Sequence, residues 1–284
     1  MHLSDKALLV HLSVSQWTAR KLDRKASAIV SDKNVGNFNK TLLPTCNSIG
    51  VVHKETSYIR KDFYHNVLPW GIEGTFILPS ANYLPMTTEY REKKGRWDGY
   101  VETFLDDYPQ AKLDAERILN SGEHDLYNPR DYPTVADLRN KFKMELTFLP
   151  VPIAGDFRVE LADGAVDSIT AELEERIAES SKVAMQDVWQ RLYDKVEWLA
   201  DRLGDPNNVF HAATYEDAQD LCKLLTRLNF TEDADLEKMR AKAEKKLFAL
   251  HPEAIKNDPD VRKDTAKDAE AIMKQMKGFM GGSE

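Results

Sequence analysis

A single long helical pattern in the C-terminal half is the strongest constraint that this sequence places on its fold. Between Asp167 and Leu203, apolar residues recur every three or four positions, which is the spacing of one face of an α-helix. At about 1.5 Å per residue, such a helix would be roughly 55 Å long, so it needs packing partners along its length. The apolar face consists of Ile169, Leu173, Ile177, Ala184, Val188, Leu192, Val196, Leu199 and Leu203.

Several other segments share this periodicity and predict further helices. Residues 69–85 are expected to form an irregular loop, because Pro69, Pro79 and Pro85 interrupt the pattern. The predicted helices cover residues 15–31, 45–66, about 86–108, 109–120, 233–250 and 260–277. A capping box at Thr214 and Asp217 predicts one more helix, with apolar residues at Leu221, Leu224, Leu225 and Leu228.

Short strands are predicted only in the middle of the chain. Residues 145–150 and 157–161 alternate apolar and polar side chains, which is typical of strands. The predicted fold class is therefore mainly α with a small β-hairpin or short sheet and long C-terminal helices.

The predicted domain organisation has two parts, divided near Gly164. Residues 1–162 would form a basic α(+β) DNA-binding region, and residues 163–284 an acidic helical region containing the long helix 167–203. The glycine-rich tail, residues 278–284, is expected to be mobile.

Charge is distributed unevenly along the sequence. The net charge is −8, but residues 1–97 contain 14 Lys/Arg against 8 Asp/Glu, and residues 98–284 contain 25 against 39. A basic N-terminal third is suited to contacts with phosphates, and an acidic remainder would limit indiscriminate binding to duplex DNA. The alternative is a mixed solvated surface whose charges cluster by chance.

The sequence lacks the features of several protein classes. Cys46 and Cys222 form no CxxC motif, and no apolar run approaches the ~20 residues that span a bilayer. We expect no signal peptide, because the sequence begins without a basic leader. Phosphate-binding, dinucleotide-binding and nucleophile-elbow motifs are absent as well. We therefore expect no enzyme, no cofactor and no metal site; a nuclease with a carboxylate-bound metal is the enzymatic alternative.

An aromatic residue and four cations occupy one side of the first predicted helix. Trp17, Arg20, Lys21, Arg24 and Lys25 lie at i, i+3, i+4, i+7 and i+8. Proteins that bind single-stranded nucleic acid use this combination, because cations neutralise phosphates and aromatic faces stack on bases. The alternative is a solvated basic face with Trp17 in the core.

The same combination of residue types recurs in later segments. If the helices pack side by side, these clusters would form one groove for a nucleic acid. For Arg60 and Lys61, the alternative is a favourable interaction with the dipole of their own helix. For the aromatic residues, the alternative is ordinary burial in the core. The candidates are Arg60, Lys61 and Tyr64, then Arg91, Lys93, Lys94, Arg96 and Trp97, and separately Lys40 and Trp70.

Five segments resemble a phage-borne family whose function is not known. They are residues 12–23 (LSVSQWTARKLD), 66–71 (NVLPWG), 78–83 (LPSANY), 126–133 (LYNPRDYP) and 150–161 (PVPIAGDFRVEL). That family is similar to Drc, a single-stranded-DNA-binding RNA polymerase cofactor of certain podoviruses, and is often encoded beside a MoxR-type ATPase.

The resemblance and the basic clusters together predict a single-stranded-DNA-binding phage protein. It would act in viral transcription or replication in the cytoplasm of an infected bacterial host, would form homo-oligomers and would recruit an RNA polymerase. No membrane contact is expected. The alternative is a protein–protein adaptor for a MoxR-type ATPase or a host target, without nucleic acid.

Overall fold

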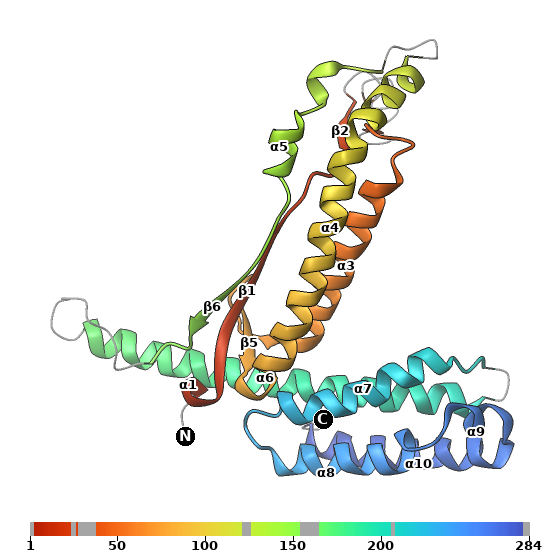
Figure 1. Ribbon diagram of the computed structural model, residues 1–284. Helices are drawn as coiled ribbons and strands as arrows, with labels where there is room; N and C mark the ends of the chain where they lie inside the picture. The colour runs from red at the N-terminus through yellow and green to blue at the C-terminus, as the bar shows by residue number, and fades with distance from the viewer. Residues whose placement is uncertain are drawn as a thin grey trace. The chain divides into compact units, whose positions relative to one another are not determined.

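The computed structural model describes residues 3–23, 27, 38–120, 126–153, 165–205 and 208–280. Long helices dominate it, accompanied by a small antiparallel sheet and a two-stranded hairpin (Figure 1). The predicted fold class is confirmed.

The chain forms two compact units that do not follow the predicted division at residue 162. Unit 1 consists of residues 1–11, 66–86 and 148–284, and unit 2 of residues 12–65 and 87–147. Since each unit is assembled from separate stretches of sequence, a single cut in the chain cannot separate them.

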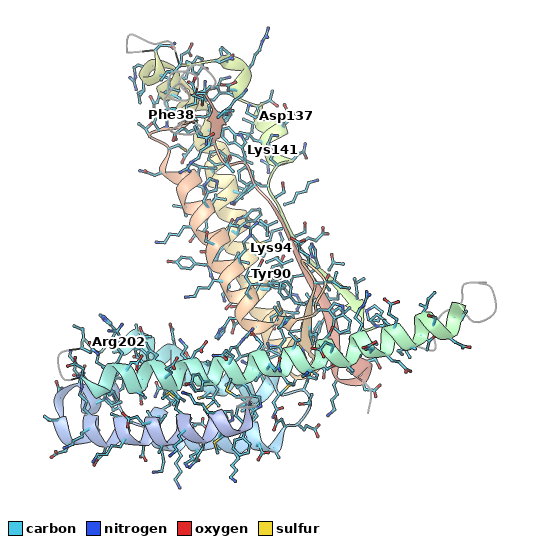
Figure 2. The ribbon with its side chains drawn as sticks, turned by 180° about the vertical axis from the view of Figure 1, so that it is seen from behind. Phe38, Tyr90, Lys94, Asp137, Lys141 and Arg202 are labelled. Carbon is cyan, nitrogen blue, oxygen red and sulfur yellow. The ribbon has the colours of Figure 1, made fainter. Side chains whose placement is uncertain are left out.

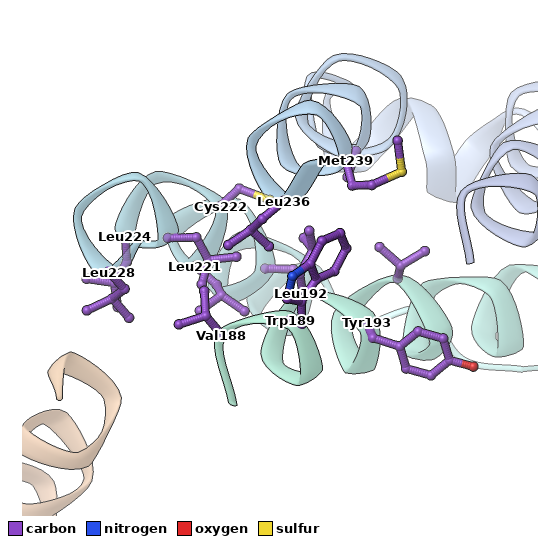
Figure 3. Close-up of a cluster of buried hydrophobic side chains, with 14 of the residues drawn as sticks. Val188, Trp189, Leu192, Tyr193, Leu221, Cys222, Leu224, Leu228, Leu236 and Met239 are labelled. Atoms are coloured by element: carbon purple, nitrogen blue, oxygen red, sulfur yellow. The ribbon is translucent and has the colours of Figure 1, made fainter. Parts of the chain in front are cut away.

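Unit 1 is organised around the predicted long helix, which the structure confirms as α6 (Ala165–Gly204). Its residues Val188, Leu192, Val196 and Leu199 are completely buried. Figure 3 shows part of this core, where α6 meets the next two helices. The remaining helices are α7 (Ala212–Leu228), α8 (Ala234–Ala243), the π-helix η3 (Glu244–Phe248), α9 (Pro252–Asn257) and α10 (Pro259–Phe279).

The C-terminal end of α6 is capped by an arginine from α10. The Arg262 Nη2 atom lies 2.7 Å from the carbonyl oxygen of Arg202, 3.0 Å from that of Asp205 and 2.9 Å from that of Asn208. A cation at this position also complements the helix dipole.

The end of α10 differs from the predicted mobile tail at residues 278–284. Gly278 and Phe279 are helical, and the ring of Phe279 stacks on Trp189 with centroids 5.8 Å apart. This ring contact explains why the helix continues to Phe279. Residues 281–284 lie outside the described part of the chain.

The sheet has the strand order β4-β5-β1-β6. The central antiparallel pair aligns Ala7 with Pro79 and Val10 with Phe76. A four-residue helix, α1 (Leu3–Lys6), precedes it. The strands are β1 (Ala7–Ser15), β4 (Leu68–Pro69), β5 (Phe76–Pro79) and β6 (Lys143–Pro150).

The strands differ in part from the loop and the two strands predicted for these segments. The predicted loop at residues 69–85 is wrong, since it contains β5 and the beginning of a helix at Ser80. The predicted strand 145–150 is confirmed as part of β6, and the predicted strand 157–161 lies outside the described residues.

Unit 2 is built on two helices that run side by side (Figure 1): α3 (Asn47–Asn66) and, from Thr87 onward, α4 (Ser80–Leu119). The prediction of α3 is confirmed. The predicted break at Tyr108-Pro109 is wrong, because α4 continues through Pro109. Proline removes one helical hydrogen bond, but Leu105, Tyr108 and Ala111 are buried on either side of it and hold the helix together.

Small elements complete unit 2. The hairpin pairs Arg20 with Thr41 and Leu22 with Asn39. A second hydrophobic core, separate from that of unit 1, includes Val52, Ile59 and Phe104. The small elements are β2 (Arg20–Leu22), β3 (Asn39–Thr41), the 3₁₀ turn η1 (Pro129–Asp131) and α5 (Val135–Arg139).

Candidate nucleic-acid interface

The first predicted cluster does not lie on a helix. The predicted helix 15–31 is wrong, because residues 7–15 form β1 and residues 20–22 form β2. A helix would have buried Leu22, which is instead 42% exposed. Trp17 packs in the unit 2 core, with ring centroids 5.9 Å from Tyr108 and 6.3 Å from Phe104. The helical alignment of these candidates is therefore lost.

The cations of this first cluster differ in exposure and ion pairing. Arg20 is exposed and forms no ion pair with a described residue. Arg24 and Lys25 lie outside the described part of the chain. Of the five predicted residues, only Arg20 thus remains as a described and unpaired cation.

Lys21 and Lys40 both bind a carboxylate within unit 2. The side chain of Asp131 is only 3% exposed, and its oxygens lie 2.5 Å from Lys21 Nζ and 2.8 Å from Lys40 Nζ. Burial alone would raise the pKa of Asp131, but hydrogen bonds and charges from the two lysines outweigh burial and lower it. Lys40 also donates to the Leu126 carbonyl, 2.7 Å away. These lysines therefore fasten the β2–β3 hairpin to η1.

The predicted cations of α4 are mostly paired as well. Lys93 Nζ lies 2.7 Å from Asp62 and 3.2 Å from Glu89. Lys94, labelled in Figure 2, lies 2.7 Å from Asp98 one turn further along the same helix. The other two candidate cations of this helix are Arg91 and Arg96.

The two arginines of this helix, Arg96 and Arg91, differ in whether they form an ion pair. Arg96 Nη2 lies 3.1 Å from Glu55 on α3, whereas Arg91 is exposed and has no ion-pair partner among the described residues. Arg91 is thus the one predicted cation of α4 that the described structure leaves unpaired.

Two predicted stacking residues belong to the cores. Trp97 is 2% exposed, and its indole Nε1–H donates to Thr56 Oγ1 at 2.8 Å. Trp70 is 3% exposed in unit 1, where its carbonyl accepts a hydrogen bond from Ser180. Neither ring has a face available to a base, which is the outcome that aromatic burial makes common.

The outer side of α3 is where cations and aromatic rings do come together. Lys54, Tyr58 and Lys61 follow one another at helical spacing, and Arg60 and Tyr64 lie beside them. All five are exposed, with Tyr58 at 54% and Tyr64 at 53%. We call these five residues the basic face of α3.

The carboxylates of α3 do not neutralise this face. Glu55 and Asp62 form the ion pairs with Arg96 and Lys93 of α4 described above. Their side chains are 13% and 28% exposed. Because these two carboxylates are paired across the helix–helix contact, the outer side of α3 retains its positive charge.

The cations of the basic face are available for a ligand. Lys54, Arg60 and Lys61 form no ion pair with any described residue. The Nζ atom of Lys54 lies 5.7 Å from the centroid of the Tyr58 ring, within range of a cation–π interaction. This contact orients Tyr58 without covering it.

A polar network fixes the opposite side of α3 and thereby its rotation. His53 Nε2 lies 2.8 Å from the Trp17 carbonyl oxygen, and the Thr56 hydroxyl lies 2.8 Å from Gln16 Oε1. Thr56 also accepts the hydrogen bond from Trp97. With these partners satisfied, the helix presents its basic face in one orientation.

The basic face has the chemistry of a phosphate and base binder. At about 1.5 Å per residue, Lys54 and Tyr64 are roughly 15 Å apart along the helix. Three cations over this distance can neutralise phosphates, and the tyrosine rings can stack on unpaired bases. No group of side chains that could hold a metal ion occurs within the described residues.

Sequence reasoning found only part of this face. Arg60, Lys61 and Tyr64 were predicted, but Lys54 was missed and Tyr58 was not assigned to the site. The apolar periodicity of residues 45–66 predicts the helix clearly, and the spacing of residues 54, 58 and 61 on it could have revealed Lys54 and Tyr58.

Comparisons with known proteins do not identify a relative. No family model, curated protein or solved structure matches this chain. The resemblance to a phage-borne family therefore stays a prediction. Within the described residues, no helix combines the length and the apolar character needed to cross a membrane.

Proposed function

We propose that this protein binds single-stranded DNA through the basic face of α3, without strong sequence preference. The observation that supports this proposal is the exposed alignment of unpaired cations with Tyr58 and Tyr64 on one helix. Cations and aromatic faces contact the phosphates and the bases that every single strand offers, whatever its sequence.

The size of the face sets the expected binding strength. Neutralising about three phosphates of a single strand gives a slope of log affinity against log salt near −2. Stacking contributes about 1–3 kcal/mol per base, and duplex DNA cannot supply an unpaired base for it. Binding is therefore expected to be modest, steeply dependent on salt and selective for single strands.

The test is a fluorescence anisotropy titration of the full chain with labelled oligo-dT and a matched duplex across a salt series. Tighter binding of oligo-dT, weakening with salt at the slope above, is the expected result. Negligible binding of both ligands at low salt would end the proposal.

A matched pair of triple variants localises the site. Replacing Lys54, Arg60 and Lys61 by Gln should abolish most of the binding. The control replaces Arg130, Lys141 and Lys143 by Gln. These three residues are exposed in the same unit, and their replacement removes the same amount of positive charge. If the control loses as much affinity as the first variant, net charge rather than the basic face accounts for binding.

The biological setting is a proposal that rests on the resemblance alone. The protein would act in phage transcription or replication in the cytoplasm of an infected bacterial host, as a homo-oligomer that recruits an RNA polymerase. Nuclear magnetic resonance or cross-linking with the purified polymerase would test the recruitment directly.

A second candidate function is a protein–protein adaptor for a MoxR-type ATPase or a host target. One observation favours it, because five predicted DNA contacts are paired with carboxylates of this chain: Lys21, Lys40, Lys93, Lys94 and Arg96. Charge reversal at Lys54 and Lys61 would leave an adaptor active, and pull-down with the ATPase would recover the complex.

A further inference from the structure

The first part of α6, residues Ala165–Glu179, is packed less tightly than the rest of that helix. No side chain described between residues 166 and 179 is buried, whereas Ser180 and Ala184 are. Figure 2 shows these first turns extending beyond the other helices of unit 1. We call residues 165–179 the arm.

The arm nevertheless has an apolar ridge. Val166, Ile169, Leu173 and Ile177 follow one another at spacings of three, four and four, which places them on one side of the helix. All four are half-buried. Ile177 packs against the unit 1 core, but Ile169 and Leu173 belong to neither core of the described residues. Those two positions therefore lie outside both described cores.

Carboxylates flank this ridge on both sides. At about 100° per residue, Asp167 and Glu174 lie on one side of Leu173, and Glu172 and Glu179 lie on the other. The only cation of the arm is Arg176, which lies 2.9 Å from Glu172. Lys182, just beyond the arm, lies 3.8 Å from Glu179. The arm thus combines an apolar stripe with two acidic margins, of which the one with Asp167 and Glu174 has no ion pair among the described residues.

We propose that the arm is a docking site for a basic amphipathic helix of another protein. The partner would place apolar side chains on the ridge and Lys or Arg beside the flanking carboxylates, in the manner of a two-helix coiled coil. The charge pattern of the arm selects this chemistry, because a neutral or acidic helix would leave the carboxylates unmatched or repelled.

A second copy of this chain fits the arm less well. Two arms would bring their acidic margins together. The basic face of α3 would set Lys54 and Lys61, the centre of that face, against a ridge that requires apolar contacts. The acidic margins therefore favour a different protein over a second copy as the partner of the arm.

The dimensions of the arm predict a weak and salt-sensitive complex. Fifteen residues of helix span about 22 Å, which is too short to bury the roughly 800 Å² per partner of a standard stable interface. Attraction between exposed charges is also screened by salt. We expect micromolar binding that serves a transient contact.

The probe is a synthetic fluorescein-labelled peptide of about five helical turns, with leucines at the ridge spacing and lysines on both margins. Its anisotropy is measured against the full chain at low and high salt. A peptide with the same composition in scrambled order and one with Glu in place of Lys are the controls. The amphipathic basic peptide should bind at least about tenfold more tightly than either control.

Variants of the ridge locate the contact on the arm. Ile169→Ser combined with Leu173→Ser should lower peptide affinity by about tenfold or more, because two apolar contacts are lost. The control combines Val209→Ser with Leu113→Ser, which removes side chains that are 64% and 60% exposed elsewhere. The control should bind the peptide like the unchanged chain.

Variants of the margins test the charge pattern. Glu172→Gln with Glu174→Gln should lower affinity several-fold at low salt and flatten the salt dependence. The matched control is Glu216→Gln with Asp217→Asn on α7, where both side chains are exposed. Circular dichroism should show all variants folded, because none of these side chains belongs to a core.

Three results would overturn the proposal. They are no binding of the basic amphipathic peptide, equal binding of the scrambled peptide, or an unchanged affinity in the ridge variant. Sedimentation of the chain alone provides a fourth, because self-association that requires Ile169 and Leu173 would assign the ridge to a second copy. No assay here contains DNA, so the outcome is independent of the function proposed for α3.

Discussion

The two units differ in charge far more than in architecture. Unit 1 contains 20 Lys/Arg and 30 Asp/Glu, whereas unit 2 contains 19 and 17. Both consist of long helices with their own hydrophobic cores. The near-neutral unit nevertheless has the clearest basic surface, because its carboxylates Glu55 and Asp62 are paired away from α3's outer side. The placement of ion pairs, rather than net charge, decides which surface can attract an anion.

The largest expected effect tests whether the units are separate at all. Leu192→Ala in unit 1 and Phe104→Ala in unit 2 each remove a completely buried side chain and should cost about 2–5 kcal/mol of unfolding free energy. Hydrogen exchange measured by mass spectrometry should show loss of protection mainly in the mutated unit. Equal loss across both units would mean that they unfold as one.

The next effect concerns the aromatic part of the basic face. Tyr58→Ala should weaken oligo-dT binding by about 1–3 kcal/mol, because one stacking ring is removed. Tyr58→Phe retains the ring and should bind almost normally, which separates stacking from the hydroxyl. Anisotropy titration checks both, and an unaffected Tyr58→Ala variant would limit the contact to phosphates.

A smaller effect concerns the Asp131 carboxylate that holds Lys21 and Lys40. Asp131→Asn should lower the unfolding free energy of unit 2 by about 1–2 kcal/mol, discounted because Lys21 is half exposed to solvent. The pKa of Asp131 is lowered by folding, so its stabilisation is present above the unfolded value of about 3.9 and is lost as pH falls through the folded value.

Urea unfolding of Asp131→Asn and the unchanged chain at several pH values measures this effect. The difference between them should be constant from about pH 7 to pH 5 and should shrink below about pH 4. A difference that stayed constant down to pH 3 would show that the ionised carboxylate is not the source of the stabilisation.

The smallest expected effect sharpens the role of the α4 cations. Lys93→Gln with Arg96→Gln releases Glu55 and Asp62, which should lower oligo-dT affinity by about two- to fivefold through unfavourable charge near the basic face. Lys94→Gln is the control, since its partner Asp98 is on α4 itself. Equal losses in both variants would favour direct contacts between α4 and DNA.

Sequence periodicity predicted the elements that bury a continuous apolar stripe. The long helix α6 and the helix α3 were found because their apolar spacing extends over many turns. The helix at residues 15–31 was predicted from cation spacing and a few apolar residues, but residues 20–22 pair instead with residues 39–41 as a β-hairpin. Pro109 was read as a break because the packing on both sides of it cannot be seen in the sequence.

The candidate site was predicted less completely than the fold. Lys21 and Asp131 are 110 positions apart, so their ion pair depends on tertiary contacts that local patterns do not encode. The same applies to Arg96 with Glu55. The sequence located the end of α3 correctly, but only the structure distinguishes the cations available to a ligand from those already paired.

The interleaved composition of unit 1 has a consequence during synthesis on the ribosome. Ala7 and Leu9 of β1 share one hydrophobic core with Val188 and Leu192 of α6. The apolar side chains of β1 therefore cannot be buried against α6 until α6 has left the exit tunnel. At about 5–20 residues per second, this interval is on the order of ten to forty seconds, during which the nascent chain is open to chaperones and to aggregation.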